Sequence, residues 1–514
     1  MNKLLSYYQK ELSFLKKQGA EFARKYPKIA RRLGYNQGVS EDPHIQRLTE
    51  SFAFLSSRIH QRLDEDLPEL MEALLRNLAP QFLFHYPSSC IASFEPDQKS
   101  SGITSSYNVP SGTAIYSKHK SETICQFRTV YPLTIVPATV NEARIYYDNL
   151  SSLWKIELNL DVFDGAKFSL DGVRFYLNGL ATVTGIIYTL LCDEVDSIVL
   201  QKNNDILYGV KTDISGAGFY EGEVTLPRTG NVSYIHNLTL DYFSFPERFN
   251  FIDVKFDSGI ELCSGDSVRF IITLKISAGK YDPDKIEKHV SEELFRVNCS
   301  PVVNLFEKKT EPLQLSDGQD EYQVNADLYS RGKVLIWDIN KVTLHRYENN
   351  LIRQFPLKNL FGIDHSLIQQ SCNIFWHTSC YRMSSERRNF DESVYIRLSD
   401  DGGAQSRIMS GDVLSIDAIC TNGDIPSSMN NGDPAGDFDS DIDIAHLRIT
   451  ALKRPSRMQP AMTLKGMNWR IISQLSLNFV LLGGTDGAMK LREMLSIYNY
   501  NNNHSVSIFI EWIK

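Results

Sequence analysis

The chain has 514 residues, of which 42% are hydrophobic and 23% are charged, a composition that is typical of globular proteins and suggests about two to four domains. With 54 Lys and Arg against 62 Asp and Glu, the net charge is −8, which argues against a surface shaped throughout for nucleic acid. We therefore expect the partners to be proteins.

Cysteine usage and apolar runs indicate the compartment. Eight cysteines lie far apart with no C-x-x-C pair, a pattern typical of reduced thiols rather than of a disulfide framework. The first residues lack the apolar run of a secretory signal, and charge or glycine interrupts every apolar run well before the roughly 18 residues of a membrane span. The sequence therefore predicts a cytoplasmic protein.

Residues 1–34 are predicted to form a basic helix, because nine Lys and Arg stand against two Glu, a net charge of +7. Large residues recur on it at steps of four and three, which is typical of a helix that packs lengthwise against another helix. We call these residues the first seam: Tyr8, Leu12, Leu15 and Phe22. Nucleic-acid binding by the local charge is an alternative, but the acidic helix that follows favours helix packing.

A second helix is predicted to begin at Pro43. Its apolar residues also recur at steps of four and three, and we call them the second seam: Leu48, Phe52, Leu55 and Ile59. Residues 41–75 hold eight acidic and three basic residues, a net charge of −5. Both seams are predicted to form a partner interface, and the alternative that they pair only with each other inside one chain stays open.

Beyond these helices the pattern changes to alternating and β-branched runs. We predict a helical assembly region at 1–88, a first β-rich domain at 89–278, a second β-rich domain at 279–465, and C-terminal helices with a terminal strand at 466–514. The Asn, Gly, Asp, Pro and Ser-rich segment 422–443 is predicted to be a mobile loop. The predicted fold class is α+β multidomain, with an N-terminal helical bundle segment, two β-rich sandwich-like regions and a helical C-terminal segment.

Signatures of reactive sites fail on their spacing. The glycines of "GAGFYEG" (216–222) depart from a dinucleotide loop, and the alternate aspartates at 437–443 lack the glycine and glutamate of an EF-hand. One set of zinc-type ligands has a spacing that fits no common finger: His365, Cys372, His377 and Cys380. We therefore predict no catalytic residue, no metal and no cofactor. The aromatic segment "DYFSFPERFNF" (241–251) is expected to form a corner of the core, because large apolar residues usually pack inside; a binding patch is the alternative.

Two N-terminal stretches resemble the signature of a known family: "YYQKELSFLKKQGAEFARKYPKIARRLG" (7–34) and "DPHIQRLTESFAFLSSRIHQRLDEDLPELMEALLRNLAP" (42–80). They are similar to TssF, a baseplate subunit of the bacterial type VI secretion system. Later segments resemble the family in the same order, among them "VPSGTAIYS" (109–117), "DYFSFPERFNFIDV" (241–254) and "WRIISQLSLNFVLL" (469–482).

The resemblance implies a structural protein rather than an enzyme. In the family, two TssF copies assemble with one TssG into a wedge of the platform that surrounds the spike hub, VgrG, and carries the contractile sheath; TssE and TssK are further partners. A helix bundle shared by the two TssF copies and TssG is expected to use the seams. The resemblance also implies a cytoplasmic protein that is docked at the inner-membrane secretion complex when assembled and binds no nucleic acid. Family members continue beyond "LREMLSIYNYNNN" (491–503), so the contacts of any further domain are not carried over.

Two other classes of protein stay open. One is a ligand- or carbohydrate-binding β-sandwich protein with a helical oligomerisation arm, which predicts a concave aromatic pocket. The other is a metal-dependent enzyme that uses the zinc-type set, which predicts stoichiometric zinc.

Overall fold

The structure is a computed structural model. It describes residues 8–9, 11–12, 15, 28, 35–36, 39–40, 43–66, 73–76, 78–97, 103–118, 123–207, 210–227, 234–276, 286–316, 319, 321–327, 332–348, 351–360, 374–382, 392–400, 411–444, 446–461, 471–472, 487–499 and 504–513. The chain forms two compact units: Met1–Arg76 with Lys465–Ser476, and Asn77–Leu464 with Leu477–Lys514.

The first unit is built around one long helix, α3 (Pro43–Asp66), which has 24 residues. A short hairpin of β1 (Tyr35–Asn36) and β2 (Val39–Ser40) precedes it. Proline suits the first position of a helix, because its fixed φ is helical and it lacks the N–H that would have no partner there. No helix in the described part of the chain has the length and apolar character that crossing a membrane requires.

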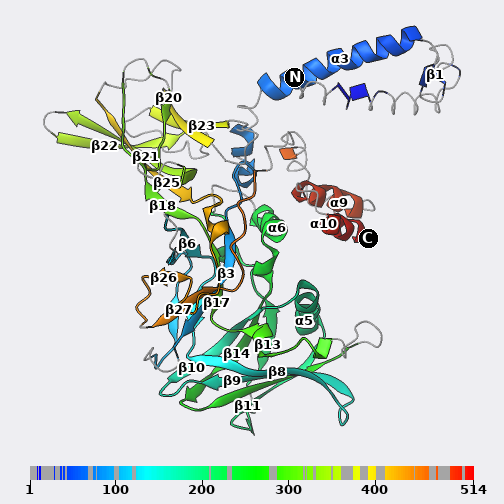
Figure 1. Ribbon diagram of the computed structural model, residues 1–514, viewed down its shortest axis with the longest axis vertical. Helices are drawn as coiled ribbons and strands as arrows, with labels where there is room; N and C mark the ends of the chain where they lie inside the picture. The colour runs from blue at the N-terminus through cyan, green and yellow to red at the C-terminus, as the bar shows by residue number, and fades with distance from the viewer. Residues whose placement is uncertain are drawn as a thin grey trace. The chain divides into compact units, whose positions relative to one another are not determined.

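The second unit contains a closed barrel of six strands (Figure 1). In barrel order these are β17 (Cys299–Val303), β3 (Ser89–Pro96), β27 (Leu447–Ala451), β26 (Phe438–Ser440), β5 (Ala114–Ser117) and β6 (Gln126–Thr129). Alternate residues of β5 and β6 are buried, as expected when one face of each strand lines a barrel. Phe127 and Phe438 meet edge to face in its core, with ring centroids 5.3 Å apart. A two-stranded sheet pairs β4 (Tyr107–Val109) with β7 (Leu133–Ile135).

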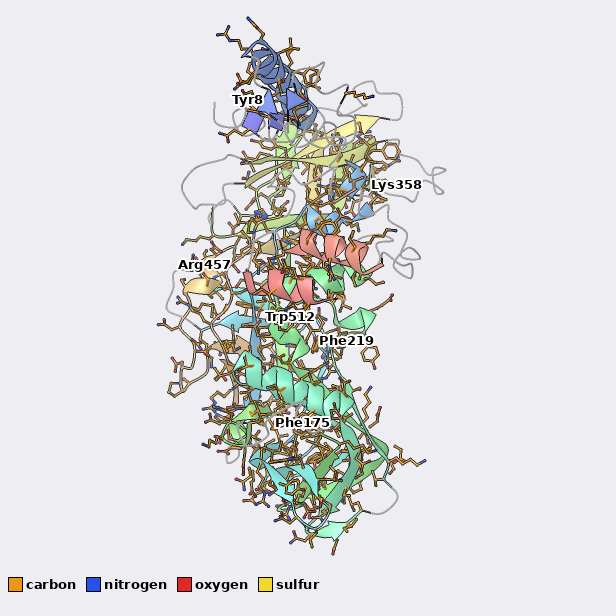
Figure 2. All side chains as sticks on the ribbon, turned by 90° about the vertical axis from the view of Figure 1, so that its right-hand side faces the viewer. Tyr8, Phe175, Phe219, Lys358, Arg457 and Trp512 are labelled. Carbon is orange, nitrogen blue, oxygen red and sulfur yellow. The ribbon has the colours of Figure 1, made fainter. Side chains whose placement is uncertain are left out.

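Two further antiparallel sheets share one hydrophobic core. One has the order β13 (Thr212–Gly216), β14 (Phe251–Cys263), β10 (Lys167–Leu177) and β16 (Phe295–Arg296). The other has the order β12 (Asp205–Ile206), β11 (Val195–Lys202), β15 (Ser267–Leu274), β9 (Leu153–Val162) and β8 (Ala138–Asp148). Phe175 of β10 meets Phe270 of β15 edge to face in the shared core, with ring centroids 5.9 Å apart. Figure 2 labels Phe175. Helix α5 (Ala181–Asp193) adds Ile187 and Leu190 to this core and lies beside β13 (Figure 1).

The largest sheet has its own core. Its order is β18 (Phe306–Lys309), β25 (Val413–Thr421), β21 (Leu335–Glu348), β22 (Leu351–Asn359), β23 (Ile374–Arg382), β24 (Glu392–Asp400) and β20 (Glu321–Gln323), and β19 (Leu313–Gln314) also pairs with β25. Asn304 ties this sheet to the barrel, because its amide Nδ2 donates to the backbone oxygen of Gln126 at 2.7 Å and its Oδ1 accepts from Thr421 Oγ1 at 2.8 Å.

Helices α6 (Tyr234–Ser244), α9 (Gly487–Tyr498) and α10 (His504–Trp512) also belong to the second unit. Tyr498 of α9 stacks on Phe243 of α6, with ring centroids 5.8 Å apart, and its hydroxyl lies 2.9 Å from His236 Nδ1. Burial lowers the pKa of His236. Short 3₁₀ turns complete the unit: η1 (Pro80–Phe82), η2 (Glu221–Glu223), η3 (Pro246–Phe249), η4 (Glu292–Leu294) and η6 (Ile425–Ser428).

The predicted α+β fold class is wrong, because the part of the chain that the structure describes is mostly β, with 45% strand against 25% helix. The expected N-terminal helical bundle is not found among the described residues of 1–88, where α3 is the one long helix and its second seam faces solvent. The prediction of two separate sandwich-like regions is also wrong, since the barrel contains strands from both of them. Pairing β3 with β27 joins residues more than 300 positions apart, which local patterns do not reveal.

The C-terminal prediction is corrected as well. The helices α9 and α10 do not form a segment of their own, since they belong to the unit that holds the barrel. The expected terminal strand is helix α10. Its β-branched and aromatic residues favour strand locally, but packing against α9 decides the outcome. The segment 422–443 is not simply a loop, because it contains barrel strand β26.

Candidate functional site

The second seam lies along one exposed face of α3. The exposed fractions of its side chains are 73% for Leu48, 60% for Phe52, 57% for Leu55 and 61% for Ile59. Four large apolar side chains in a row on one helix face are unusual for a free surface. This face is therefore suited to being covered by another helix or groove.

The buried face of α3 lies on another side of the helix, at Ala53 and Ser57. A helix turns about 100° per residue, which places this pair roughly 150° from the middle of the second seam. Ser56, beside the buried face, donates a hydrogen bond to Glu11 Oε2 at 3.2 Å. Glu11, which belongs to the first predicted helix, therefore contacts α3 on a side other than the second seam.

The first seam is described in part. Tyr8, Leu12 and Leu15 are helical and half-buried, whereas Phe22 lies outside the described residues. The use of both seams by a partner stays a prediction. The alternative that the seams cover only each other does not fit the described residues, because the second seam is exposed.

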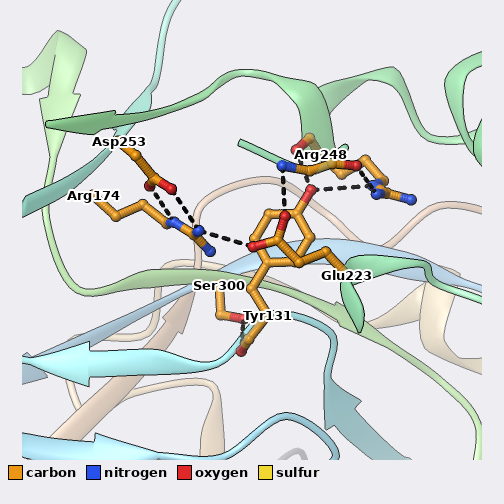
Figure 3. A network of polar contacts seen from close by, with 7 residues as sticks. Tyr131, Arg174, Glu223, Arg248, Asp253 and Ser300 are labelled. Atoms are coloured by element: carbon orange, nitrogen blue, oxygen red, sulfur yellow. Dashed lines mark hydrogen bonds and ion pairs between the residues drawn. The ribbon is translucent and has the colours of Figure 1, made fainter. Parts of the chain in front are cut away.

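A group of charged side chains is buried where the barrel meets the sheet of β10 and β14. We call it the buried charge network, and Figure 3 shows it around a central tyrosine. Its members are Tyr131, Arg174, Glu223, Asp241, Arg248 and Asp253. Tyr131 follows β6, and the others come from α6, η2, η3 and the two strands.

Arg248 is the largest fully buried side chain among the described residues. Its Nη1 forms a close ion pair with Asp241 Oδ2, its Nη2 donates to the backbone oxygen of Gly218 at 2.6 Å, and its Nε donates to Tyr131 Oη at 3.1 Å. The Tyr131 hydroxyl in turn donates to the backbone oxygen of Arg248 at 2.7 Å. Burial raises the pKa of Tyr131 to about 12, so this hydroxyl keeps its proton and remains a donor.

Arg174 forms the other half of the network. It lies directly opposite Asp253 in the sheet and binds both carboxylate oxygens, at 2.6 and 2.8 Å, and it donates to Glu223 Oε1 at 2.8 Å. Burial alone would lower the pKa of Arg174, but the two carboxylates outweigh it and raise the pKa above its ordinary value. The Tyr131 ring lies between the guanidinium groups of Arg174 and Arg248, 5.1 and 5.6 Å from their central carbons (Figure 3).

All six carboxylate oxygens of the network accept a hydrogen bond. Glu223 Oε2 accepts from Gly218 N at 2.8 Å, Asp241 Oδ1 accepts from Tyr86 Oη at 2.9 Å, and the arginines take the others. Arg174 Nη1 is the one donor of these two arginines that is buried without a hydrogen-bond partner among the described residues. A buried network whose acceptors are all satisfied holds its elements in one arrangement. Here it fastens α6 and η3 to the sheet and to the turn after β6.

The sequence reasoning missed this network, although two segments carried a signal for it. The glycine-rich segment 216–222 joins the end of β13 to η2. Its Gly218 has φ +95°, and a Cβ there would come within 2.4 Å of the Tyr131 hydroxyl. Glycine is needed at that position for its conformation and for the close approach. The aromatic segment 241–251 forms the expected corner of the core, with Phe245, Phe249 and Phe251 buried.

The predicted ligand sets are placed as follows. His365 and Cys372 lie outside the described residues, and His377 and Cys380 belong to β23. Within the described ranges, no group of three or more His, Cys, Asp or Glu side chains is arranged to hold a metal ion. Asp437 is not a solvated loop residue, because it is buried and accepts hydrogen bonds from the backbone N–H groups of Gly432, Asp433 and Ala451 at 2.9 to 3.1 Å.

Comparison with known proteins gives one consistent result. The family model described as "Type VI secretion system, TssF" matches residues 1–514. The chain is similar to the type VI secretion system component TssF1 of Pseudomonas aeruginosa, with 27% identity over 100% of this chain and 86% of the relative.

Two solved structures share the fold. One is a chain of the TssK-TssF-TssG baseplate subcomplex of the type VI secretion system, with a TM-score of 0.71 and 20% identity, covering 91% of this chain and 84% of that chain. The other belongs to the baseplate complex from the type VI secretion system, with a TM-score of 0.54 and 19% identity, covering 99% of this chain and 85% of that chain.

Proposed function

Because the family model spans its whole length, the chain belongs to the TssF family of the type VI secretion system, and from this premise we propose that it is a structural subunit of the baseplate wedge. In that role two copies of the chain assemble with one TssG. The wedge forms part of the platform around the VgrG spike hub, and TssK and TssE join it. The assembled platform is docked at the inner-membrane secretion complex, on its cytoplasmic side.

The observation that carries the proposal is the exposed second seam. The four side chains are between 57% and 73% exposed, and fully burying one such side chain contributes about 1.5–3 kcal/mol. Covering the exposed parts would therefore contribute roughly 4–8 kcal/mol in total. A partner helix that packs along α3 and contacts the four residues of the second seam would gain that stabilisation.

The proposal assigns the chain no catalytic step. Its buried charge network serves to hold the barrel and the sheet of β10 and β14 in one arrangement, so that contacts made at different surfaces act on one body. Support for this role comes from the complete satisfaction of the network's carboxylates.

Co-expression with the TssG of the same organism tests the proposal. The chain carries an affinity tag and TssG is untagged, so that TssG is recovered only through a complex. We expect TssG in the eluate at a constant ratio to the chain across gel filtration. The matched negative control is the same chain with Phe52→Asp and Leu12→Asp. Recovery of the wild-type chain as a monomer without TssG would refute the wedge role.

A further inference from the structure

Three exposed aromatic side chains gather beside the buried charge network in the second unit. Phe219 and Tyr220 lie between β13 and η2, Tyr242 lies in the last turn of α6, and the three are 47%, 55% and 58% exposed. We call them the aromatic patch, and Figure 2 labels Phe219. Because a large aromatic side chain can bury about 150–250 Å², the patch exposes roughly 300 Å². Exposed apolar patches of this size are often functional.

The buried charge network fixes the patch in place. Phe249 is buried beneath it, with its ring centroid 5.4 Å from that of Phe219 and 5.7 Å from that of Tyr242. Phe249 follows the fully buried Arg248 in η3. Phe219 follows Gly218, whose backbone N–H and oxygen both form hydrogen bonds with the network. The rings are therefore ordered before a partner arrives, which lowers the entropic cost of binding.

Guanidinium groups and aromatic rings alternate from the interior to the patch. The Arg174 guanidinium carbon lies 5.1 Å from the centre of the Tyr131 ring. The Arg248 guanidinium carbon lies 5.6 Å from the same ring and 4.6 Å from the ring of Phe249. The series then reaches the aromatic patch, which packs on Phe249. The next group in this alternation, on the solvent side of the patch, would be a cation.

One ring of the patch already has a cation over it. Lys255 Nζ lies 5.6 Å from the centre of the Tyr220 ring. Over the rings of Phe219 and Tyr242, no cation is found among the residues that the structure describes. The faces of exposed aromatic rings attract cations, and arginine more often than lysine.

The groups beneath and around the patch carry an excess of negative charge. The buried charge network contains two arginines and three carboxylates, so one negative charge remains. Helix α6 ends at the patch, and the C-terminus of a helix carries a partial negative charge. At the border, Lys255 lies opposite Asp213 in the sheet. Lys453 lies 3.9 Å from Glu247, and exposed Glu221 adds one more carboxylate. The patch therefore favours a cation over an anion.

We propose that the aromatic patch binds an arginine side chain of another baseplate protein, with the guanidinium group over the rings of Phe219 and Tyr242. A planar guanidinium group stacks on rings, whereas the lysine ammonium is a strongly hydrated point charge. A standard interface buries about 800 Å² on each partner, so the patch is one anchor within a larger contact. The inference rests on the proposed function only in seeking the partner among baseplate proteins.

Photocrosslinking in the assembled complex tests this inference. The photoreactive residue p-benzoylphenylalanine replaces Gly222, which is exposed and has open space for a side chain. The chain is co-expressed with TssG and TssK, and the complex is isolated by gel filtration and irradiated. We expect mass spectrometry to find a crosslink to a segment of TssG or TssK that contains an arginine. Replacing that arginine by glutamine should lower the yield about five- to thirtyfold, and replacing it by lysine should lower it less.

Variants of the chain itself give a second readout. The double variant with Phe219→Leu and Tyr242→Leu keeps an apolar surface but removes the two ring faces, so the yield should again fall about five- to thirtyfold. The matched control is Tyr147→Leu, which changes an exposed tyrosine of β8 outside the patch and should leave the yield unchanged. If the double variant lowers the thermal midpoint of the free chain, the substitutions in the partner decide, because they leave this chain intact.

The outcomes separate this inference from the wedge role. A complex that assembles but gives no crosslink, or gives one only between two copies of the chain, would overturn the inference and leave the wedge role intact. The same holds for a crosslinked segment without arginine and for a yield that survives replacement of the arginine by glutamine. Failure of the wild-type chain to form a complex with TssG or TssK would overturn both.

Discussion

Replacing Phe52 and Leu55 by alanine should weaken binding to TssG while leaving the chain's own stability nearly unchanged. The two side chains are 60% and 57% exposed in the isolated chain. Full burial of such a side chain contributes about 1.5–3 kcal/mol, so covering the exposed part contributes about 1–2 kcal/mol for each residue. The pair is therefore expected to cost about 2–4 kcal/mol of binding free energy, which corresponds to about a 30- to 700-fold rise in Kd.

The assay is titration of immobilised TssG with each purified variant by biolayer interferometry, together with thermal unfolding of the variant alone. The matched control is Arg47→Ala, an exposed residue of α3 that lies outside the second seam. The reverse control is Ala53→Leu on the buried face, which should lower the thermal midpoint through overpacking. An unchanged Kd for the double variant would refute the reasoning, and so would a large fall in its thermal midpoint, because the seam would then belong to the chain's own core.

Three further predictions follow from the second unit. Arg248→Ala leaves Asp241 buried without its cation and should lower the free energy of unfolding by about 3–5 kcal/mol in urea titration, with Arg248→Lys intermediate; a wild-type midpoint would contradict this. Burial lowers the pKa of His236 below its unfolded value, so the unfolded chain binds more protons below about pH 6.5 and stability should fall from pH 7.5 to pH 5.5. The variant His236→Gln should flatten that dependence, and an unchanged pH profile would contradict the assignment. Mass spectrometry after brief treatment with iodoacetamide should find exposed Cys263 modified well before buried Cys299, whose pKa is raised to about 12 by burial.

The part of the fold that the sequence predicts well is the part that local spacing decides. Apolar residues spaced three and four positions apart identify the helix at Pro43–Asp66 and its seam, because helical periodicity depends only on neighbours along the chain. Which side of α3 is buried could not be predicted from this spacing. Among the described side chains of α3, the buried ones are those of two small residues, Ala53 and Ser57, and small residues give a weak hydrophobic signal.

The barrel and the buried charge network depend on contacts between distant residues. Strand β26 is three residues long and lies in a segment rich in turn-forming residues, so it reads as a loop until its barrel partners β5 and β27 are known. Arg174 and Asp253 are 79 positions apart and become neighbours only through strand pairing. From the sequence alone, these two charged residues are expected at the surface, because burial of a charge becomes favourable only when its partner is present.

The family assignment succeeded for a different reason. The stretches that resemble TssF run from the first helix to residue 482 in family order, and the family model matches the whole chain. The fold-class prediction is wrong for the same chain, because it relied on the helical stretches at the two ends and took too little account of the many short strands between them.

Native mass spectrometry of the tagged chain co-expressed with TssG gives the most direct test of the wedge role. We expect a complex with two copies of the chain and one TssG, and we expect it to be lost in the variant with Leu12→Asp and Phe52→Asp. A chain that remains monomeric in the presence of folded TssG, or a double variant that still forms the complete complex, would contradict assembly through the seams.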